Sequence, residues 1–153
     1  MGSVTEIKFT GTCSSDITTA EADSYRNNVC KQFMAVEGRR LTIEIHVDDK
    51  TNQLTLSFHN AAEQIVQRFK VENPEFYRLA REYRSAVTIY EKAEEEGTAD
   101  MLELLGHNRR RCHSAGAEAL AAIIKDIGLP YDAVRPLFYL CAHAIRATEQ
   151  EPT

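Results

Sequence analysis

The chain has 153 residues, of which 43% are hydrophobic and 27% charged, with 18 Lys and Arg against 23 Asp and Glu. This composition is that of an ordinary globular protein, and it excludes collagen-like, low-complexity and wholly disordered chains. The formal net charge of −5 argues against general binding to nucleic acid or to anionic membranes. We expect neither a membrane span, which needs roughly 18 apolar residues, nor a signal peptide.

The first third of the sequence predicts a small sheet with one helix. Alternation of apolar and polar residues predicts a strand over about 4–11. A capping box at its start and apolar residues at spacings of three and four predict a helix over about 18–36. Strict alternation over 41–47 and again over 54–58, across a turn-forming segment, predicts an antiparallel hairpin with one buried face.

After Phe58 the apolar period changes from two residues to about 3.6. Asn60, with Glu63 three positions later, predicts a short capped helix. That helix would carry three apolar residues, Ile65, Val66 and Phe69.

Two long helices with heptad spacing follow. Asn73-Pro74 starts the first, which runs over 74–96 and ends at Gly97. Thr98 caps the second, over about 99–127, so the pair predicts a tight αα-hairpin. Its apolar seam would begin at Met101 and end at Ala122.

A final helix over about 132–147, capped by Asp132, completes the fold. The fold class is therefore α+β. A three-stranded antiparallel or mixed sheet with one helix is followed by a helical part built on the hairpin. We expect one domain over 1–153, with the sheet in about 1–59 and the helices in about 60–148.

The hairpin has its acidic and basic residues in different places. Six acidic residues lie around the predicted turn: Glu91, Glu94, Glu95, Glu96, Asp100 and Glu103. Six arginines lie further from the turn: Arg78, Arg81, Arg84, Arg109, Arg110 and Arg111. If the chain folds back symmetrically at Gly97, the arginines of the two helices become neighbours.

The leading hypothesis is a non-enzymatic binding or regulatory protein that acts by protein–protein interaction. It would assemble as a homo-oligomer, most simply a dimer, in which each acidic turn packs on the partner's basic region. An alternative is that the arginines, with Asn108, bind or sequester a phosphorylated small molecule or nucleotide. A third interpretation is a solvated helix face with exposed ion pairs. Adjacent residues on a helix point about 100° apart, so Arg109, Arg110 and Arg111 cannot all contact the same small ligand.

The remaining polar residues predict no catalytic residue, metal site or cofactor. Cys112 is followed by His113, and Cys141 lies two residues before His143, whereas zinc-binding helices space their ligands by three or four. A cysteine/histidine enzyme is a further alternative. Small or polar residues in the second long helix predict a close approach of helices; they are Asn108, Cys112, Ala115, Gly116 and Ala119. The alternatives are a pocket lined by Asn108 and Cys112, or a polar Asn108 that sets the register of an oligomeric bundle. The wide spacing of the four cysteines indicates reduced thiols in a cytoplasmic protein.

Overall fold

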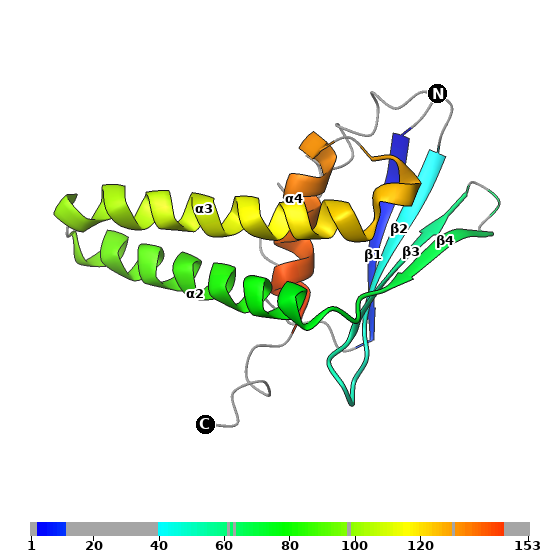
Figure 1. Ribbon diagram of the computed structural model, residues 1–153, viewed down its shortest axis with the longest axis horizontal. Coiled ribbons are helices and arrows are strands. Elements are labelled where there is room, and N and C mark those ends of the chain that lie inside the picture. Colours follow the sequence, from blue (N-terminus) through cyan, green and yellow to red (C-terminus); the bar gives the residue numbers. More distant parts are fainter. Residues whose placement is uncertain are drawn as a thin grey trace.

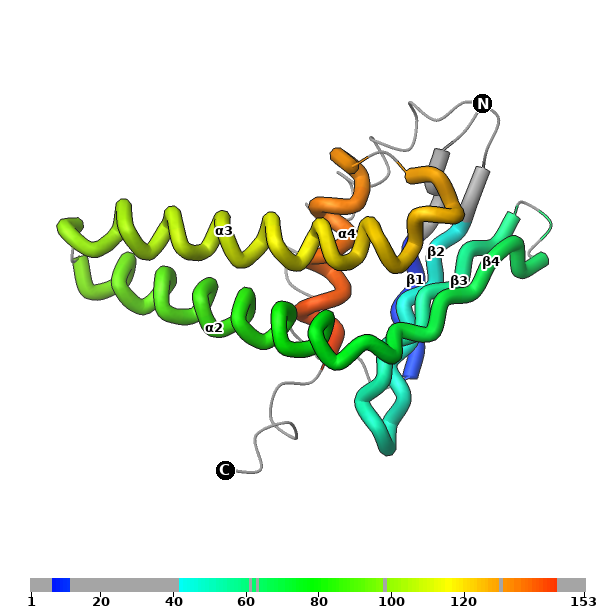
Figure 2. Tube along the Cα trace, viewed as in Figure 1, coloured from blue at the N-terminus to red at the C-terminus, as the bar shows by residue number. Residues whose placement is uncertain are grey.

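The computed structural model describes residues 3–11, 40–60, 62, 64–97, 99–129 and 131–145, and its fold is α+β (Figures 1 and 2). The sheet has the strand order β1-β2-β3-β4. Its strands are β1 (Ser3–Gly11), β2 (Arg40–Val47), β3 (Leu54–His59) and β4 (Ile65–Lys70). β1 and β2 are parallel and the other pairs are antiparallel, so the sheet is mixed.

The strands predicted over 4–11, 41–47 and 54–58 are confirmed, as is the antiparallel hairpin. The helix predicted over 18–36 lies outside the described residues. The side chains of Ile43, Ile45, Leu54, Leu56 and Phe58 are fully buried, as alternation predicts for the core face of a sheet.

The short helix predicted after Phe58 is wrong, because this segment forms the fourth strand. Asn60 Oδ1 does accept from backbone N–H groups, those of Ala62 and Gln64, both at 2.9 Å. These two bonds close a turn, which is also held by a hydrogen bond from Asn60 N to Gln64 O at 2.9 Å. Phe69 then pairs with Leu56 and packs edge-on against the ring of Phe58, with ring centroids 5.9 Å apart. Pairing with β3 outweighs the helical spacing.

Three helices follow the sheet: α2 (Pro74–Glu96), α3 (Ala99–Ile123) and α4 (Tyr131–Ala144). The predicted N-cap is confirmed, because Asn73 Oδ1 accepts from Glu75 N at 3.0 Å. Gly97 ends α2 in the left-handed conformation, with φ 70°, as the sequence predicts.

The later helix ends differ from the prediction. α3 stops at Ile123 instead of 127, and a 3₁₀ turn, η2 (Lys125–Ile127), leads to Gly128 with φ 75°. α4 begins at Tyr131, so Asp132 lies in its first turn and is not its cap.

Helix α4 connects the hairpin to the sheet (Figure 1). One buried apolar cluster runs from the strands through α4 to α2 and α3. The predicted close approach is confirmed at Gly116, where an added Cβ would lie 2.0 Å from Phe138 Cζ. The predicted α3 seam is wrong at both ends, because Met101 and Ala122 are exposed. Packing against α4 as well as α2 turns the buried face of α3 toward Gly116, Ala117 and Leu120.

The end of the hairpin near Gly97 extends beyond α4 (Figures 1 and 2). Within α3 the buried residues begin at Gly106. The first two turns of α3 therefore present side chains to solvent.

Candidate functional site

Arg78 is engaged by carboxylates of its own helix. Its guanidinium donates to both Glu75 and Glu82, one turn away on either side. These contacts raise the pKa of Arg78, and Arg78 lowers the pKa of Glu75. All three side chains are about half exposed, so the pairs contribute little to stability.

Arg84 and Arg109 are used inside the fold. Arg84 donates to the carbonyl oxygens of Ala142, at 3.2 Å, and Ile145, at the C-terminal end of α4. It thus satisfies carbonyl groups that the helix itself leaves unpaired. The guanidinium of Arg109 lies over the ring of Tyr90, 4.3 Å from its centroid, in a cation–π contact.

The facing positions of the hairpin differ from those of a symmetric fold-back. Tyr83 lies against His113, with ring centroids 5.1 Å apart, and Tyr90 lies under Arg109. A Cβ on Gly106 would be 3.2 Å from the Tyr90 ring. The partners of Tyr83 and Tyr90 therefore lie further along α3 than a symmetric fold-back at Gly97 predicts.

Arg81 lines a separate depression of about 400 Å³. Its other lining residues are Thr51, Asn52, Gln53, Val71, Glu72 and Tyr77. A different depression lies beside Arg110 and Arg111, and none of these residues lines it. The six arginines therefore do not form one binding site.

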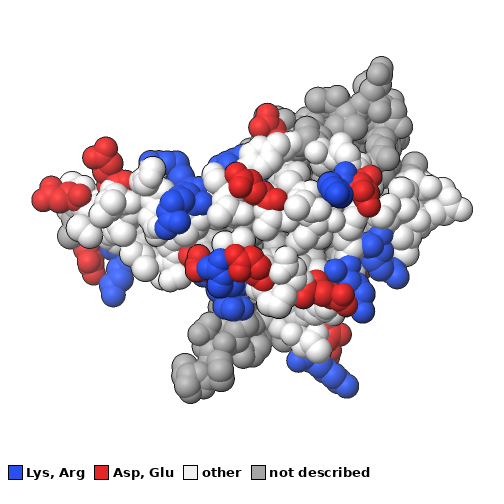
Figure 3. Space-filling view, in the orientation of Figure 1, with Lys and Arg blue, Asp and Glu red and all other residues white. Residues whose placement is uncertain are grey.

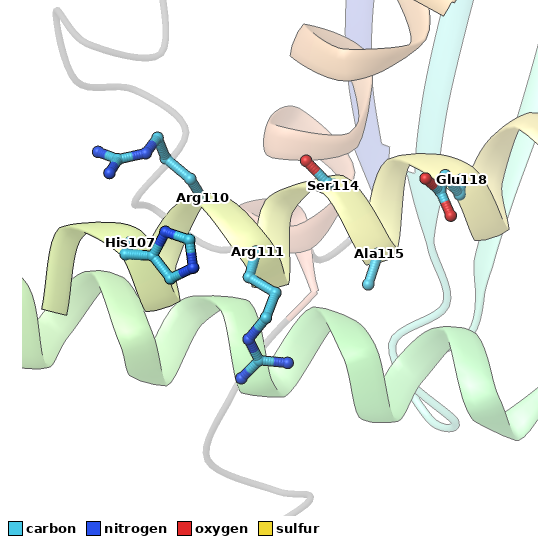
Figure 4. Close-up of a pocket in the computed structure, with 6 residues that line it drawn as sticks. All are labelled: His107, Arg110, Arg111, Ser114, Ala115 and Glu118. Carbon is cyan, nitrogen blue, oxygen red and sulfur yellow. The ribbon is translucent and has the colours of Figure 1, made fainter. Parts of the chain in front are cut away.

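Arg110 and Arg111 do share a depression, of about 470 Å³, on the surface of α3 (Figure 4). Its lining residues are His107, Arg110, Arg111, Ser114, Ala115 and Glu118. The side chains of Arg110 and Arg111 extend away from each other (Figure 4), so they do not converge on one small anion. Arg111 donates to Oδ1 of Asn108 at 2.6 Å, which places Asn108 beside this depression.

Cys112, Cys141 and His113 have the environments of packing residues. Burial raises the pKa of Cys112, whereas an activated thiol has a lowered one. Cys141 is fully buried, and Cys112 and Cys141 both carry reduced thiols. Burial, with Arg135 nearby, lowers the pKa of His113 to about 4. Among the described residues, no three His, Cys, Asp or Glu side chains are placed to hold a metal ion.

A hydrogen-bonded network lies on the sheet face opposite the core. Thr10 Oγ1 donates to Glu44 Oε2 at 2.8 Å and lies 2.8 Å from His46 Nδ1. Glu44 Oε1 lies 3.2 Å from His59 Nε2. The bond from Thr10 and the contacts with His59 hold the pKa of Glu44 below its usual value, although partial burial opposes this. The network satisfies these polar groups mutually.

Sequence reasoning did not identify the outer face of α3 near the turn. Asp100, Leu104, His107 and Arg111 are all exposed there, and Leu104 is 64% exposed. Their spacings of four, three and four place them in one row, which we call the outer stripe. The signal in the sequence is the same spacing, with a leucine between charged residues.

The comparisons identify no relative: no protein-family model, no curated protein and no solved structure matches this chain. In the part of the chain that the structure describes, no helix is long and apolar enough to cross a membrane.

Proposed function

We propose that this protein is a non-enzymatic binding protein that forms a homodimer through the outer stripe of α3. The observation that carries the proposal is the position of Leu104, the most exposed large apolar side chain among the described residues. It lies between Asp100 on one side and His107 and Arg111 on the other. Single exposed leucines are common on protein surfaces, so the support comes from the opposite charges placed on either side of Leu104.

The outer stripe is complementary to itself. When two copies of α3 pack antiparallel about a two-fold axis between Leu104 and His107, Asp100 lies opposite the partner's Arg111. Leu104 then lies against the partner's His107. Each contact occurs twice, as an isologous interface requires. The row covers about three helical turns, or roughly 16 Å of helix.

The charges around the stripe support the same orientation. On the visible face, acidic side chains gather at the free end of the hairpin and basic ones follow along α3 (Figure 3). An antiparallel partner brings its acidic end to this basic region, which favours encounter in the correct orientation. The stripe has four residues per copy, far fewer than the roughly 20–30 a side of a standard interface, so we expect a weak dimer, micromolar or weaker, that salt weakens further.

Sedimentation velocity between about 5 and 200 μM tests this proposal. Asp100→Arg and Arg111→Asp should each raise the dissociation constant at least about tenfold, because each creates two like-charge contacts. The double variant D100R/R111D restores opposite charges and should return to within about threefold of the original affinity. Lys50→Glu is the matched control, since this exposed turn residue undergoes the same charge change as Arg111→Asp.

A monomer at the highest concentration, or a double variant as weak as the single ones, would refute the dimer.

A second candidate function is binding of a phosphorylated small molecule or nucleotide at the α3 depression. It is supported by the depression that Arg110 lines together with His107 and Ser114, and Arg111 contributes less because its side chain extends away from Arg110. Calorimetry with ATP at low salt tests it. Binding that is lost in Arg110→Ala supports this candidate, and absence of binding removes it.

A further inference from the structure

The second surface of interest is the open edge of strand β4, far from the outer stripe. β4 is the last strand in the sheet order, so among the described strands it has a neighbour on one side only. It lies at the margin of the molecule (Figure 1). At its start, Ile65 and Val66 are 48% and 43% exposed.

The register shows which backbone groups point out of the sheet. Val71 N donates to Leu54 O at 2.9 Å, so this residue faces β3. Backbone groups alternate along a strand, which directs those of Phe69 and Gln67 toward β3 as well. The N–H and C=O groups of Arg68 and Lys70 therefore point away from the sheet, and they can pair with a further strand.

The side chains of β4 determine what kind of strand fits. Arg68 and Lys70 pair with Ser57 and Thr55, so they stand on the sheet face opposite the core. Arg68 Nε donates to Ser57 Oγ at 3.3 Å, which keeps the guanidinium on that face. Phe69 is on the core side.

A second copy of β4 is a poor partner for this edge. Antiparallel pairing of two such strands would bring Arg68 and Lys70 of both copies together, and like charges on neighbouring strands are destabilising. A strand with acidic residues on that face would instead meet these two cations, and its apolar residues would extend the core beside Phe69.

We propose that the β4 edge binds an extended acidic segment of another protein, in which acidic and apolar residues alternate. The segment adds to the sheet as a fifth strand. Its backbone pairs with Arg68 and Lys70, its carboxylates face their side chains, and its apolar side chains continue the core face. This inference concerns a different surface and does not depend on the dimer.

Fluorescence anisotropy with the full chain tests the proposal at low salt. The probe is a labelled ten-residue peptide of alternating Glu and Val. One comparison peptide has Lys in place of Glu, and another has the Glu/Val sequence with every residue N-methylated. We expect the Glu/Val peptide to bind at least about tenfold more tightly than either comparison peptide. The Lys/Val peptide loses the charge complementarity with Arg68 and Lys70, and the N-methylated peptide loses backbone hydrogen bonds.

Variants and hydrogen exchange locate the binding. R68E/K70E should reverse the preference toward the Lys/Val peptide, whereas Lys50→Glu, in the exposed turn, should not. Exchange of the Arg68 and Lys70 amides should slow by at least about tenfold with the Glu/Val peptide, while the Phe69 amide changes little.

Three results would each overturn the proposal. They are failure of the Glu/Val peptide to bind, equal binding of the Lys/Val peptide, and binding unaffected by N-methylation. The peptide comparisons use the unaltered protein, so they remain decisive if R68E/K70E fails to fold.

Discussion

Gly116 lies under the ring of Phe138, where the structure leaves no room for a side chain. An added Cβ would lie 2.0 Å from Cζ and 2.4 Å from Cε2 of the ring. The ring is fully buried and packs against Phe76 and Tyr83, with centroids 5.8 and 5.6 Å apart. It cannot reach normal contact distance without displacing these neighbours. We therefore expect Gly116→Ala to destabilise the protein.

The size of this effect follows from two opposing contributions. Overpacking a tight core costs about 1–3 kcal/mol, and this overlap belongs at the upper end. Replacing a helical glycine by alanine returns up to about 1 kcal/mol. The net loss is about 2 kcal/mol, which for a chain of this length lowers the melting temperature by roughly 4–8 °C.

Urea and thermal unfolding of Gly116→Ala measure this loss, with Gly106→Ala as the matched control. At Gly106 the nearest atom to an added Cβ is Tyr90 Cε1 at 3.2 Å, so a small shift is enough. We expect a change within about 1 kcal/mol there. Phe138→Leu should reduce the cost of Gly116→Ala in a double-mutant cycle. Equal stability of the two alanine variants would refute the packing argument.

Two further predictions concern charge and pH. The pKa of His113 is lowered from its usual 6.5 to about 4, mainly by burial. The unfolded state therefore binds a proton that the folded state resists, and stability falls as the pH drops through this window, by about 1–2 kcal/mol at pH 5. His113→Gln should flatten this loss between pH 7 and 5 in urea unfolding, and an unchanged slope would contradict it. Arg84→Ala should cost about 1–2 kcal/mol, because it leaves carbonyl groups of α4 unpaired, whereas Arg78→Ala should cost less than about 0.5 kcal/mol. Equal losses in urea unfolding would show that the Arg84 bonds do not stabilise α4.

The hairpin could be predicted because its signals are local. Asn73 caps α2 through its own side chain, and Gly97 adopts the left-handed conformation that ends a helix. Both depend on residues within one turn. The β2–β3 pair is equally local, since strict alternation and a short turn determine its register.

Strand β4 could not be predicted in this way. Apolar residues at 65, 66 and 69 suit one face of a helix, and Asn60 suits a helix cap as well as a turn. The arrangement is decided by pairing with β3, where Phe69 meets Leu56 and Phe58. The spacing of apolar residues within 65–69 does not indicate that β3 is the partner of this segment.

The arginines show the same division between local and distant partners. The pairing of Arg78 with Glu75 and Glu82 could have been predicted, because these residues are three and four positions away. Arg84 instead donates to residues 58 to 61 positions along the chain, and only the packing of α4 places them nearby. A count of arginines on two helices therefore overstated the number free to bind a ligand.

The two proposed surfaces lie at opposite ends of the long axis of the molecule, with the hairpin turn at one end and β4 at the other (Figure 1). A dimer formed through α3 near the turn would leave both β4 edges open. It would then present two identical acidic-peptide sites on one rigid body, and a partner carrying two such segments would bind it more tightly than a partner carrying one. This gain should diminish in Asp100→Arg, which weakens the dimer, while the affinity for a single Glu/Val peptide stays unchanged. The two surfaces can thus be separated experimentally, and together they would make the protein a bivalent connector.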